Sequence, residues 1–215
     1  MTTQHDHHGE IEFTQDYWDN RYLTADRLWS GRPNVQLVAQ AADLQPGDAL
    51  DVGCGEGADA IWLAGQGWHV TAVDVSAVAL DRAARHAAAQ GSELAARITW
   101  QQADLLSWDP AAAQFDLVSA QFMYLPHPAF EDMCARLAAA VRPRGTLLMV
   151  GHHPDEVRAR GAAVADMAWS AEQLAAALDG SFEIVVAAAI ERPATDAAGQ
   201  PISMRDTVLR ACRRL

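Results

Sequence analysis

Short apolar runs alternate with longer mixed stretches through the middle of the chain. Each run holds few residues and is almost continuously apolar, as expected for a strand buried on both faces of a parallel sheet. The intervening stretches have the length and spacing of helices in βαβ units. The pattern predicts strands over 49–53, 68–76, 97–104, 115–124 and 144–152, and helices over 57–66, 78–91 and 128–141.

The last part of the chain changes this alternation. A helix is predicted over 170–178, a strand over 182–191, a polar turn over 192–201 and a strand over 202–214. Two consecutive strands joined by a turn with no helix between them pair antiparallel. The sequence therefore predicts an α/β fold, a Rossmann-like doubly wound sheet that ends in one antiparallel hairpin.

The N-terminal part precedes this alternation. Residues 1–12 are expected to form a flexible tail, and a single domain is expected over 13–215. Thr14 is a suitable N-cap for a helix over 14–23, and Asn34 for one over 35–42. Gly31 and Pro33 lie between them in a predicted loop.

Composition and charge narrow the class of partner. The formal net charge of −12 argues against a nucleic-acid partner, which needs a basic footprint. Three well-separated cysteines without a CxxC spacing favour a cytoplasmic protein over a disulfide framework. Neither a secretory leader nor a long apolar span is evident, so we expect no membrane partner, and a monomer or homodimer that acts on small molecules.

The stretch DVGCGEG at 51–57 directly follows the first predicted strand. Ligands of doubly wound sheets bind beyond the carboxyl ends of the strands, and glycines let the backbone approach them closely. Gly53, Gly55 and Ala58 fit the dinucleotide fingerprint G-x-G-x-x-G/A, so an NAD-type oxidoreductase is one interpretation. Asp74 follows Gly53 by twenty-one residues and suits a ribose, which every adenosine cofactor carries.

Two further acids separate the possible cofactors. A carboxylate at Asp51 would repel a pyrophosphate but suits a cationic amino-acid tail. Asp104, at the end of the third predicted strand, can accept a hydrogen bond from the adenine amine. Each acid alone could simply cap a turn. Together with Asp74 they indicate S-adenosylmethionine (SAM), whose demethylated product is S-adenosylhomocysteine (SAH).

At this point a family resemblance is clear. DVGCGEG resembles motif I of the class I SAM-dependent methyltransferases, VTAVDVS resembles motif II, and QQADLLSWDP and FDLVSAQFMYLP resemble the next two. The resemblance implies a seven-stranded sheet of order 3-2-1-4-5-7-6 with strand 7 antiparallel. The cofactor residues it implies run from the methionine end to the floor: Asp51, Gly53, Cys54, Gly55, Gly57, Asp74, Val75, Asp104, Leu105, Gln121 and Phe122.

The segment YWDNRY…LWSGRPN is similar to the N-terminal cap of methyltransferases of the thiopurine and tellurite-resistance (TehB-like) type. That resemblance implies that residues 13–34 cover the cofactor, with Trp29 packed on SAM and Arg32 on its carboxylate. It also implies that Trp18 and Tyr22 lie toward the acceptor, and we place Tyr124 there as well. Alternatively, the aromatic residues only pack the extra helix onto the sheet.

The acceptor decides whether a general base is needed. A thiolate or metalloid anion needs none, whereas a neutral oxygen or nitrogen does. His152 and His153 follow the fifth predicted strand and His127 follows the fourth, so all three are candidate bases. The pairs HDHH and GHHP could supply metal ligands, but without an identifiable supporting acid we predict no metal site.

The edge of the fourth predicted strand reads SAQFMYLP, unlike the DPPY-type signature of adenine or glutamine methylation. The function predicted from the sequence is therefore SAM-dependent methyl transfer to a small-molecule acceptor, with S, Se, Te or N ahead of O. An NAD-type oxidoreductase and a non-catalytic SAM-binding regulator remain as alternatives.

Overall fold

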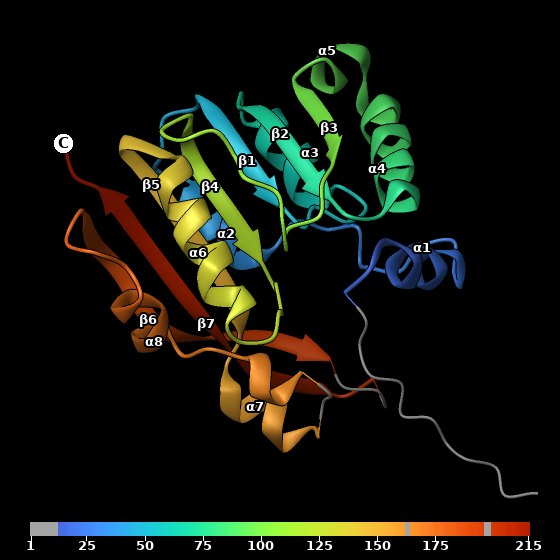
Figure 1. Ribbon diagram of the computed structural model, residues 1–215. Coiled ribbons are helices and arrows are strands. Elements are labelled where there is room, and N and C mark those ends of the chain that lie inside the picture. Colours follow the sequence, from blue (N-terminus) through green and yellow to red (C-terminus); the bar gives the residue numbers. More distant parts are fainter. Residues whose placement is uncertain (1–12, 162–163, 196–198) are drawn as a thin grey trace, which may run out of the picture.

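One seven-stranded sheet runs through the molecule in the order β3-β2-β1-β4-β5-β7-β6 (Figure 1). The computed structural model describes residues 13–161, 164–195 and 199–215. Neighbouring strands from β3 to β5 pair parallel, and β7 pairs antiparallel with both β5 and β6. This confirms the predicted fold, strand order and closing hairpin. The strands are β1 (Asp48–Val52), β2 (His69–Asp74), β3 (Ile98–Gln102), β4 (Phe115–Gln121), β5 (Val141–His152), β6 (Phe182–Thr195) and β7 (Pro201–Arg213).

The hairpin arms are longer than predicted. The prediction of a turn over 192–201 is wrong at both ends, because β6 continues to Thr195 and β7 begins at Pro201, its register partner. Pro193 is tolerated within β6 because β6 is the edge strand, where one row of backbone groups lacks a strand partner. Polar composition alone therefore did not mark where pairing stops.

The long helices follow the predicted periodicity. Thr14 and Asn34 cap α1 and α2 as predicted, by accepting hydrogen bonds from the backbone N–H groups of Tyr17 and Gln36. The short elements α5, α7 and η1 were not predicted, because one or two turns carry too little periodicity. The helices are α1 (Gln15–Leu23), α2 (Val35–Ala41), α3 (Ala58–Gly65), α4 (Ala77–Gln90), α5 (Ser92–Ala95), α6 (Ala129–Ala140), α7 (Pro154–Ala159), η1 (Ala165–Met167) and α8 (Ala171–Ala176).

Two hydrophobic cores lie on opposite faces of the sheet. One joins the sheet to α6 and α8, with Phe130, Leu137 and Leu174 among its buried members. The other joins it to α2, α3 and α4 and contains Leu37 and Leu63. In Figure 1, α6 and α8 lie in front of the sheet and α2 behind it. The strands are thus buried on both faces, which explains their continuous apolar runs.

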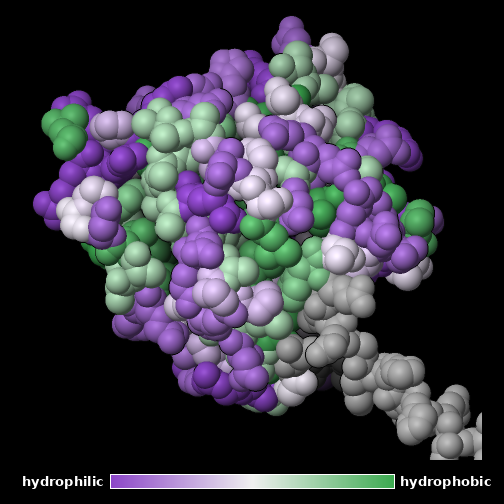
Figure 2. Space-filling view, in the orientation of Figure 1, coloured by the Kyte–Doolittle hydropathy of each residue, from purple (hydrophilic) through white to green (hydrophobic). Residues whose placement is uncertain are grey.

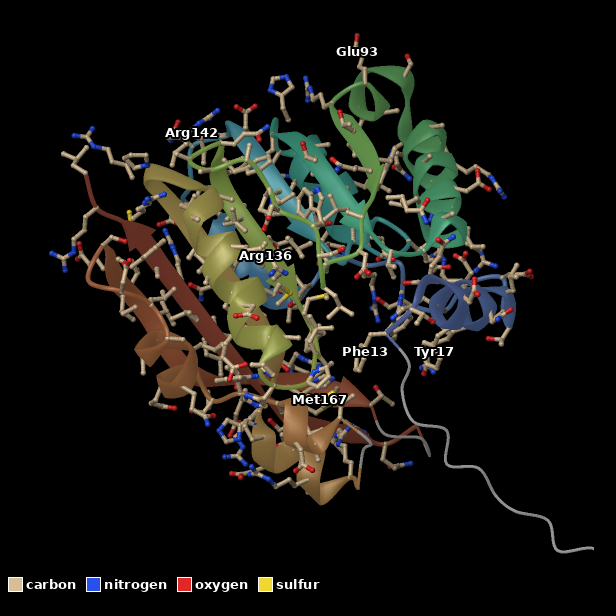
Figure 3. The ribbon with its side chains drawn as sticks, in the orientation of Figure 1. Phe13, Tyr17, Glu93, Arg136, Arg142 and Met167 are labelled. Carbon is tan, nitrogen blue, oxygen red and sulfur yellow. The ribbon has the colours of Figure 1, made fainter. Side chains whose placement is uncertain are left out.

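The carboxyl ends of the parallel strands form one edge of the molecule, with α1 beside one part of it and α7 beside the other (Figure 1). In Figure 3, Phe13 and Met167 both lie at this end, whereas Arg142 lies at the opposite end. None of the helices in the described ranges has the length and apolar character needed to cross a bilayer. The tail predicted over 1–12 lies outside the described residues, and the single domain over 13–215 stays a prediction.

Candidate cofactor and acceptor site

The glycine turn after β1 depends on left-handed backbone. Gly53, Gly55 and Gly57 have φ values of 67°, 52° and 84°, which side chains with a Cβ rarely adopt. A Cβ on Gly57 would lie 2.7 Å from the Trp100 ring and 2.8 Å from the Ala83 Cβ. Gly57 therefore lets the turn pack against β3 and α4. Its place in the sequence gave no sign of this packing role.

Asp51 is the buried acid of the turn. It is 1% exposed, and its Oδ2 has no hydrogen-bond partner among the described residues. Burial raises the pKa of Asp51 well above its usual value, and the nearby charges of Asp59 and Asp74 add to the effect. Burial also raises the pKa of Asp59, to about 6. An ammonium group placed here would satisfy the free oxygen and offset the repulsion, so these residues fit the amino-acid end of SAM.

Asp74 ties the end of β2 to the glycine turn. Its Oδ2 accepts a hydrogen bond from the Gly55 backbone N–H at 2.8 Å, and its Oδ1 accepts one from that of Ser76 at 2.9 Å. Burial raises the pKa of Asp74, and the two backbone donors partly oppose this shift. Each carboxylate oxygen keeps a second lone pair, so Asp74 can still accept from ribose hydroxyls.

An open cleft of about 380 Å³ lies beyond Asp74, between the start of α1 and the end of β3. Asp104 lines it and also accepts a hydrogen bond from the Leu106 backbone N–H. Leu105 is packed in the core, and its neighbour Leu106 lines the cleft instead. Figure 2 shows hydrophobic surface gathered in the middle of the face on view, bordered by hydrophilic surface. The other residues lining the cleft are Phe13, Thr14, Gln15, Val75, Gln102 and Ala103.

The N-terminal segment folds over the glycine turn. Tyr22 is 3% exposed, and its hydroxyl lies 2.9 Å from the position of a Cβ on Gly55. That hydroxyl accepts a hydrogen bond from Trp29 Nε1 at 3.0 Å. The structure thus places Tyr22 over the turn, with Trp18 tilted against it at 6.3 Å between ring centroids. Trp29 remains 48% exposed and Arg32 is exposed as well, so both can be reached from outside.

Glu56, which sequence reasoning missed, holds this segment in place. Its carboxylate accepts hydrogen bonds from the backbone N–H groups of Leu28 and Trp29, and it pairs with Arg82 at 3.1 Å. Asp19 adds a second attachment by accepting a hydrogen bond from the Ser76 hydroxyl. A charged residue between two glycines of the turn was the available signal, but it did not reveal its partners.

The acceptor side begins where β4 ends. Gln121 donates to the Ser119 hydroxyl, and its Oε1 is buried without a hydrogen-bond partner in the described ranges. Phe122 has a φ of 53°, a strained value for a bulky residue. Met123 follows, and its Sδ lies 2.2 Å from the position of a Cβ on Gly53. Met123 therefore connects the glycine turn to the acceptor side.

A small cavity of about 20 Å³ lies next to Met123, between β4, β5 and α8. Apolar and aromatic side chains line most of it, and Tyr124, His152 and Thr207 supply its polar groups. The Tyr124 hydroxyl accepts a hydrogen bond from the His152 backbone N–H at 3.1 Å, and burial raises the pKa of Tyr124 to about 12. Other lining residues are Phe130, Met149, Met167, Trp169 and Leu174.

The three candidate histidines have different surroundings. His152 lines the cavity and lies 4.5 Å from the Phe122 ring, centroid to centroid. His153 caps α7 by accepting a hydrogen bond from the Asp155 backbone N–H. His127 contacts the Glu131 carboxylate at 2.6 Å and lies against the Trp169 ring, at the exposed start of α6. Of the three, the structure brings His152 alone to the cavity wall.

Comparison with known proteins gives the family. Residues 49–145 match a family model described as a methyltransferase domain. The chain belongs to the class I SAM-dependent methyltransferases. This family supports the SAM interpretation over the NAD-type oxidoreductase.

This methyltransferase is similar to proteins with several different acceptors. It is 37% identical over 125 residues to a release factor glutamine methyltransferase of Chlorobaculum tepidum, covering 51% of this chain and 42% of that protein. It is 31% identical over 140 residues to a ubiquinone biosynthesis O-methyltransferase of Xylella fastidiosa, covering 64% and 54%. The chain therefore spans about half the length of these curated relatives or less.

Solved structures share the fold. A protein described by the conversion of a disulfide bond into a thioacetal group during echinomycin biosynthesis has a TM-score of 0.73 and 22% identity, covering 93% of this chain and 91% of that one. TehB from Haemophilus influenzae has a TM-score of 0.67 and 17% identity, covering 94% and 67%. N-methyltransferase NodS from Bradyrhizobium japonicum, in complex with SAH, has a TM-score of 0.70 and 19% identity, covering 94% and 99%.

The candidate metal ligands of this methyltransferase divide between two places. HDHH lies outside the described residues, and His152 and His153 have the separate contacts given above. Within the described ranges, no group of three or more His, Cys, Asp or Glu side chains is arranged to hold a metal ion.

Proposed function

We propose that this protein transfers a methyl group from SAM to a small molecule whose accepting atom is sulfur, selenium, tellurium or nitrogen, ahead of oxygen. The contact between Met123 and the glycine turn carries the proposal, because it puts the cofactor residues directly beside the apolar cavity. Methyl transfer requires that the two reactants be aligned at this short range and that water be excluded.

Cofactor roles follow the order of the site. Asp51 and the turn containing Gly53, Cys54, Gly55 and Gly57 would hold the methionine end. Asp74 and Val75 would hold the ribose, and Asp104 with the cleft would hold the adenine. Gln121 and Phe122 would form the floor. SAM supplies a methyl group made electrophilic by its sulfonium sulfur, and the aromatic residues nearby can stabilise that charge.

Residues 13–34 would act as the cap. Trp29 and Arg32 are exposed beside the turn, so their predicted contacts with SAM and its carboxylate are accessible. The buried position of Tyr22 supports a role at the cofactor end. For Trp18 the predicted role at the acceptor stays a prediction.

The cavity favours a compact apolar acceptor. Its methionine and aromatic lining suits a soft, polarisable atom, and Tyr124 and His152 offer the polar contacts. A thiol is a better match for a histidine base than an alcohol is, because its proton is lost much closer to neutral pH. His152 is accordingly the proposed base, and His153 and His127 are proposed to act in the local structure.

The cellular setting follows from composition. We propose a cytoplasmic protein, a monomer or homodimer, without a nucleic-acid partner. The acidic charge of the chain and the free cysteines Cys54, Cys134 and Cys212 support this.

Two measurements test the function. Calorimetry with SAM, SAH and NAD should show binding of the first two, and binding of NAD without SAM would contradict the proposal. Transfer of labelled methyl from SAM should then be measured for a panel of thiols, tellurite and heterocyclic amines. Binding of SAM with no transfer to any of them would favour a non-catalytic SAM-binding regulator.

A further inference from the structure

The antiparallel part of the sheet brings a buried carboxylate to the histidine at the cavity. His152 lies directly opposite Asp206 in the β5–β7 ladder, and residues in that position project from the same face. Nδ1 of His152 is 3.5 Å from Oδ1 of Asp206. The Asp206 side chain is 0% exposed and the His152 side chain is 33% exposed. The pair thus leads from the interior to the accessible wall of the cavity.

Arg192 occupies the other oxygen of Asp206. Its Nε donates to Oδ2 at 2.6 Å, from the strand β6 on the far side of β7. A buried carboxylate that forms a charge-assisted hydrogen bond with arginine is held ionised and in one orientation. The Arg192 guanidinium also lies 6.0 Å from the centre of the Phe122 ring. Oδ1 of Asp206 is therefore left to accept from a second donor.

That donor is next to it. Nδ1 of His152 and Oδ1 of Asp206 are both buried, and neither has a hydrogen-bond partner in the part of the chain that the structure describes. An unsatisfied buried polar group costs about 1–3 kcal/mol. A proton on Nδ1 directed at Oδ1 satisfies both atoms after a small movement. In that tautomer Nε2 carries the lone pair and can accept a proton.

We propose that Asp206, held by Arg192, is a positioning residue that fixes the His152 imidazole with Nε2 as proton acceptor, and that the methyl acceptor enters the cavity still protonated, as a neutral thiol or N–H compound. This inference rests on the proposed methyl transfer. It narrows the acceptor class, because an acceptor that arrives as an anion needs no such arrangement.

The proposed step balances as follows. The acceptor's S–H or N–H proton passes to Nε2, and the lone pair thus freed forms the bond to the methyl carbon. The bond from that carbon to the cofactor's sulfur breaks, and its electron pair stays on the sulfur. Asp206 remains ionised and stabilises the imidazolium. The exposed part of His152 then releases the proton to water.

The tautomer can be measured without turnover. In ¹⁵N-labelled protein, two-bond ¹⁵N–¹H spectra distinguish Nδ1–H from Nε2–H imidazoles, and His152 is assigned by the signal lost in His152→Gln. We expect Nδ1–H in the wild type. In Asp206→Asn the amide can donate to Nδ1, so the proton should move to Nε2. An Nε2–H tautomer in the wild type would overturn the proposal, and this spectrum requires no variant at Asp206 to fold.

Two thiols of similar size test the acceptor class. Phenylmethanethiol is mostly protonated at neutral pH, whereas 4-nitrothiophenol is ionised. His152→Ala and Asp206→Asn should each lower kcat for phenylmethanethiol by about 100-fold, the usual effect of a lost general base, and change kcat for 4-nitrothiophenol little. His69→Ala, an exposed histidine at the start of β2, is the matched control and should change neither. Equal losses on both thiols would indicate a merely structural role and contradict the proposal.

SAM affinity separates this inference from the proposed function. If calorimetry shows no SAM binding, the proposed function fails, whatever the tautomer is. If SAM binds and the wild-type tautomer is Nε2–H, this inference alone fails. If SAM binds and neither thiol is methylated by the wild type, the spectrum decides.

Discussion

The cofactor side and the acceptor side of the carboxyl edge are assembled in different ways. On the cofactor side, Asp51 and the three glycines are neighbours in the sequence, and Asp74 closes the turn across one strand pair. On the acceptor side, Tyr124, His152 and Asp206 come from three separate segments that the β4–β5–β7 pairing brings together. The methyltransferase-domain match, over residues 49–145, ends before His152 and Asp206.

This difference has a physical consequence. A turn that binds through its own backbone requires particular residues at fixed spacing, so it is recognisable as a motif. A cavity built across strands requires only that the register be kept, so its lining can change without disturbing the turn. We therefore expect substitutions on the cofactor side to alter folding and SAM affinity, and those on the acceptor side to alter turnover.

The largest effect is expected at Gly57. Gly57→Ala combines a left-handed backbone with a Cβ less than 3 Å from Trp100 and Ala83, and should lower the free energy of unfolding by about 3 kcal/mol. Denaturant unfolding measures this. Gly180→Ala is the control, because no described atom lies within 4 Å of its Cβ position and its φ is not positive. Equal stability of the two variants would show that the turn is not packed as described.

Asp74→Ala should weaken SAM binding by about 2 kcal/mol, through loss of hydrogen bonds to a charged acceptor. Calorimetry measures the affinity, and the exposed Asp81→Ala on α4 serves as the control. His152→Ala, on the acceptor side, should leave the affinity unchanged. If His152→Ala weakened SAM binding as much as Asp74→Ala did, the two sides would not be separable.

SAM affinity should rise with pH through the titration of Asp51 and Asp59. Burial raises both pKa values, that of Asp59 to about 6, so below that pH a proton must leave before the ammonium binds. The affinity should therefore fall about tenfold per pH unit below 6. The free protein should show the opposite sign, because stability gained from the protonated carboxyls is lost as pH rises through 6.

Methylthioadenosine is the control for that pH dependence, because it keeps the adenosine and lacks the ammonium group. Its affinity should be nearly independent of pH between 5 and 7. The same pH dependence for both ligands would mean that Asp51 and Asp59 do not face the amino-acid end.

The smallest effect is expected at the attachment of the cap. Glu56→Gln removes the charge that pairs with Arg82 and should cost about 1 kcal/mol of stability. Local loosening should also speed tryptic cleavage after Arg27 and Arg32, followed by mass spectrometry. Glu93→Gln, an exposed site on α5, should cleave at the wild-type rate. Unchanged cleavage in Glu56→Gln would show that Asp19 or the packing of Tyr22 holds the segment.

The sequence by itself determined the strand order, the closing hairpin and the acids around the glycine turn, because each depends on residues a few positions apart. Strand periodicity, turn glycines and N-caps such as Thr14 act locally, so they are visible in the sequence. Helices of one or two turns and the true length of the hairpin arms were missed, since tertiary pairing decides both.

Only the tertiary structure decided which histidine meets the cavity and what supports it. His152 and His153 are adjacent in the sequence, yet one lines the cavity and the other caps α7. Asp206 lies fifty-four residues after His152 and becomes its neighbour only through the β5–β7 register. Nor does Glu56 reveal from its position that it binds the backbone at Leu28 and Trp29. Contacts of this kind depend on how strands align and on what a buried charge finds nearby, and no local pattern records either.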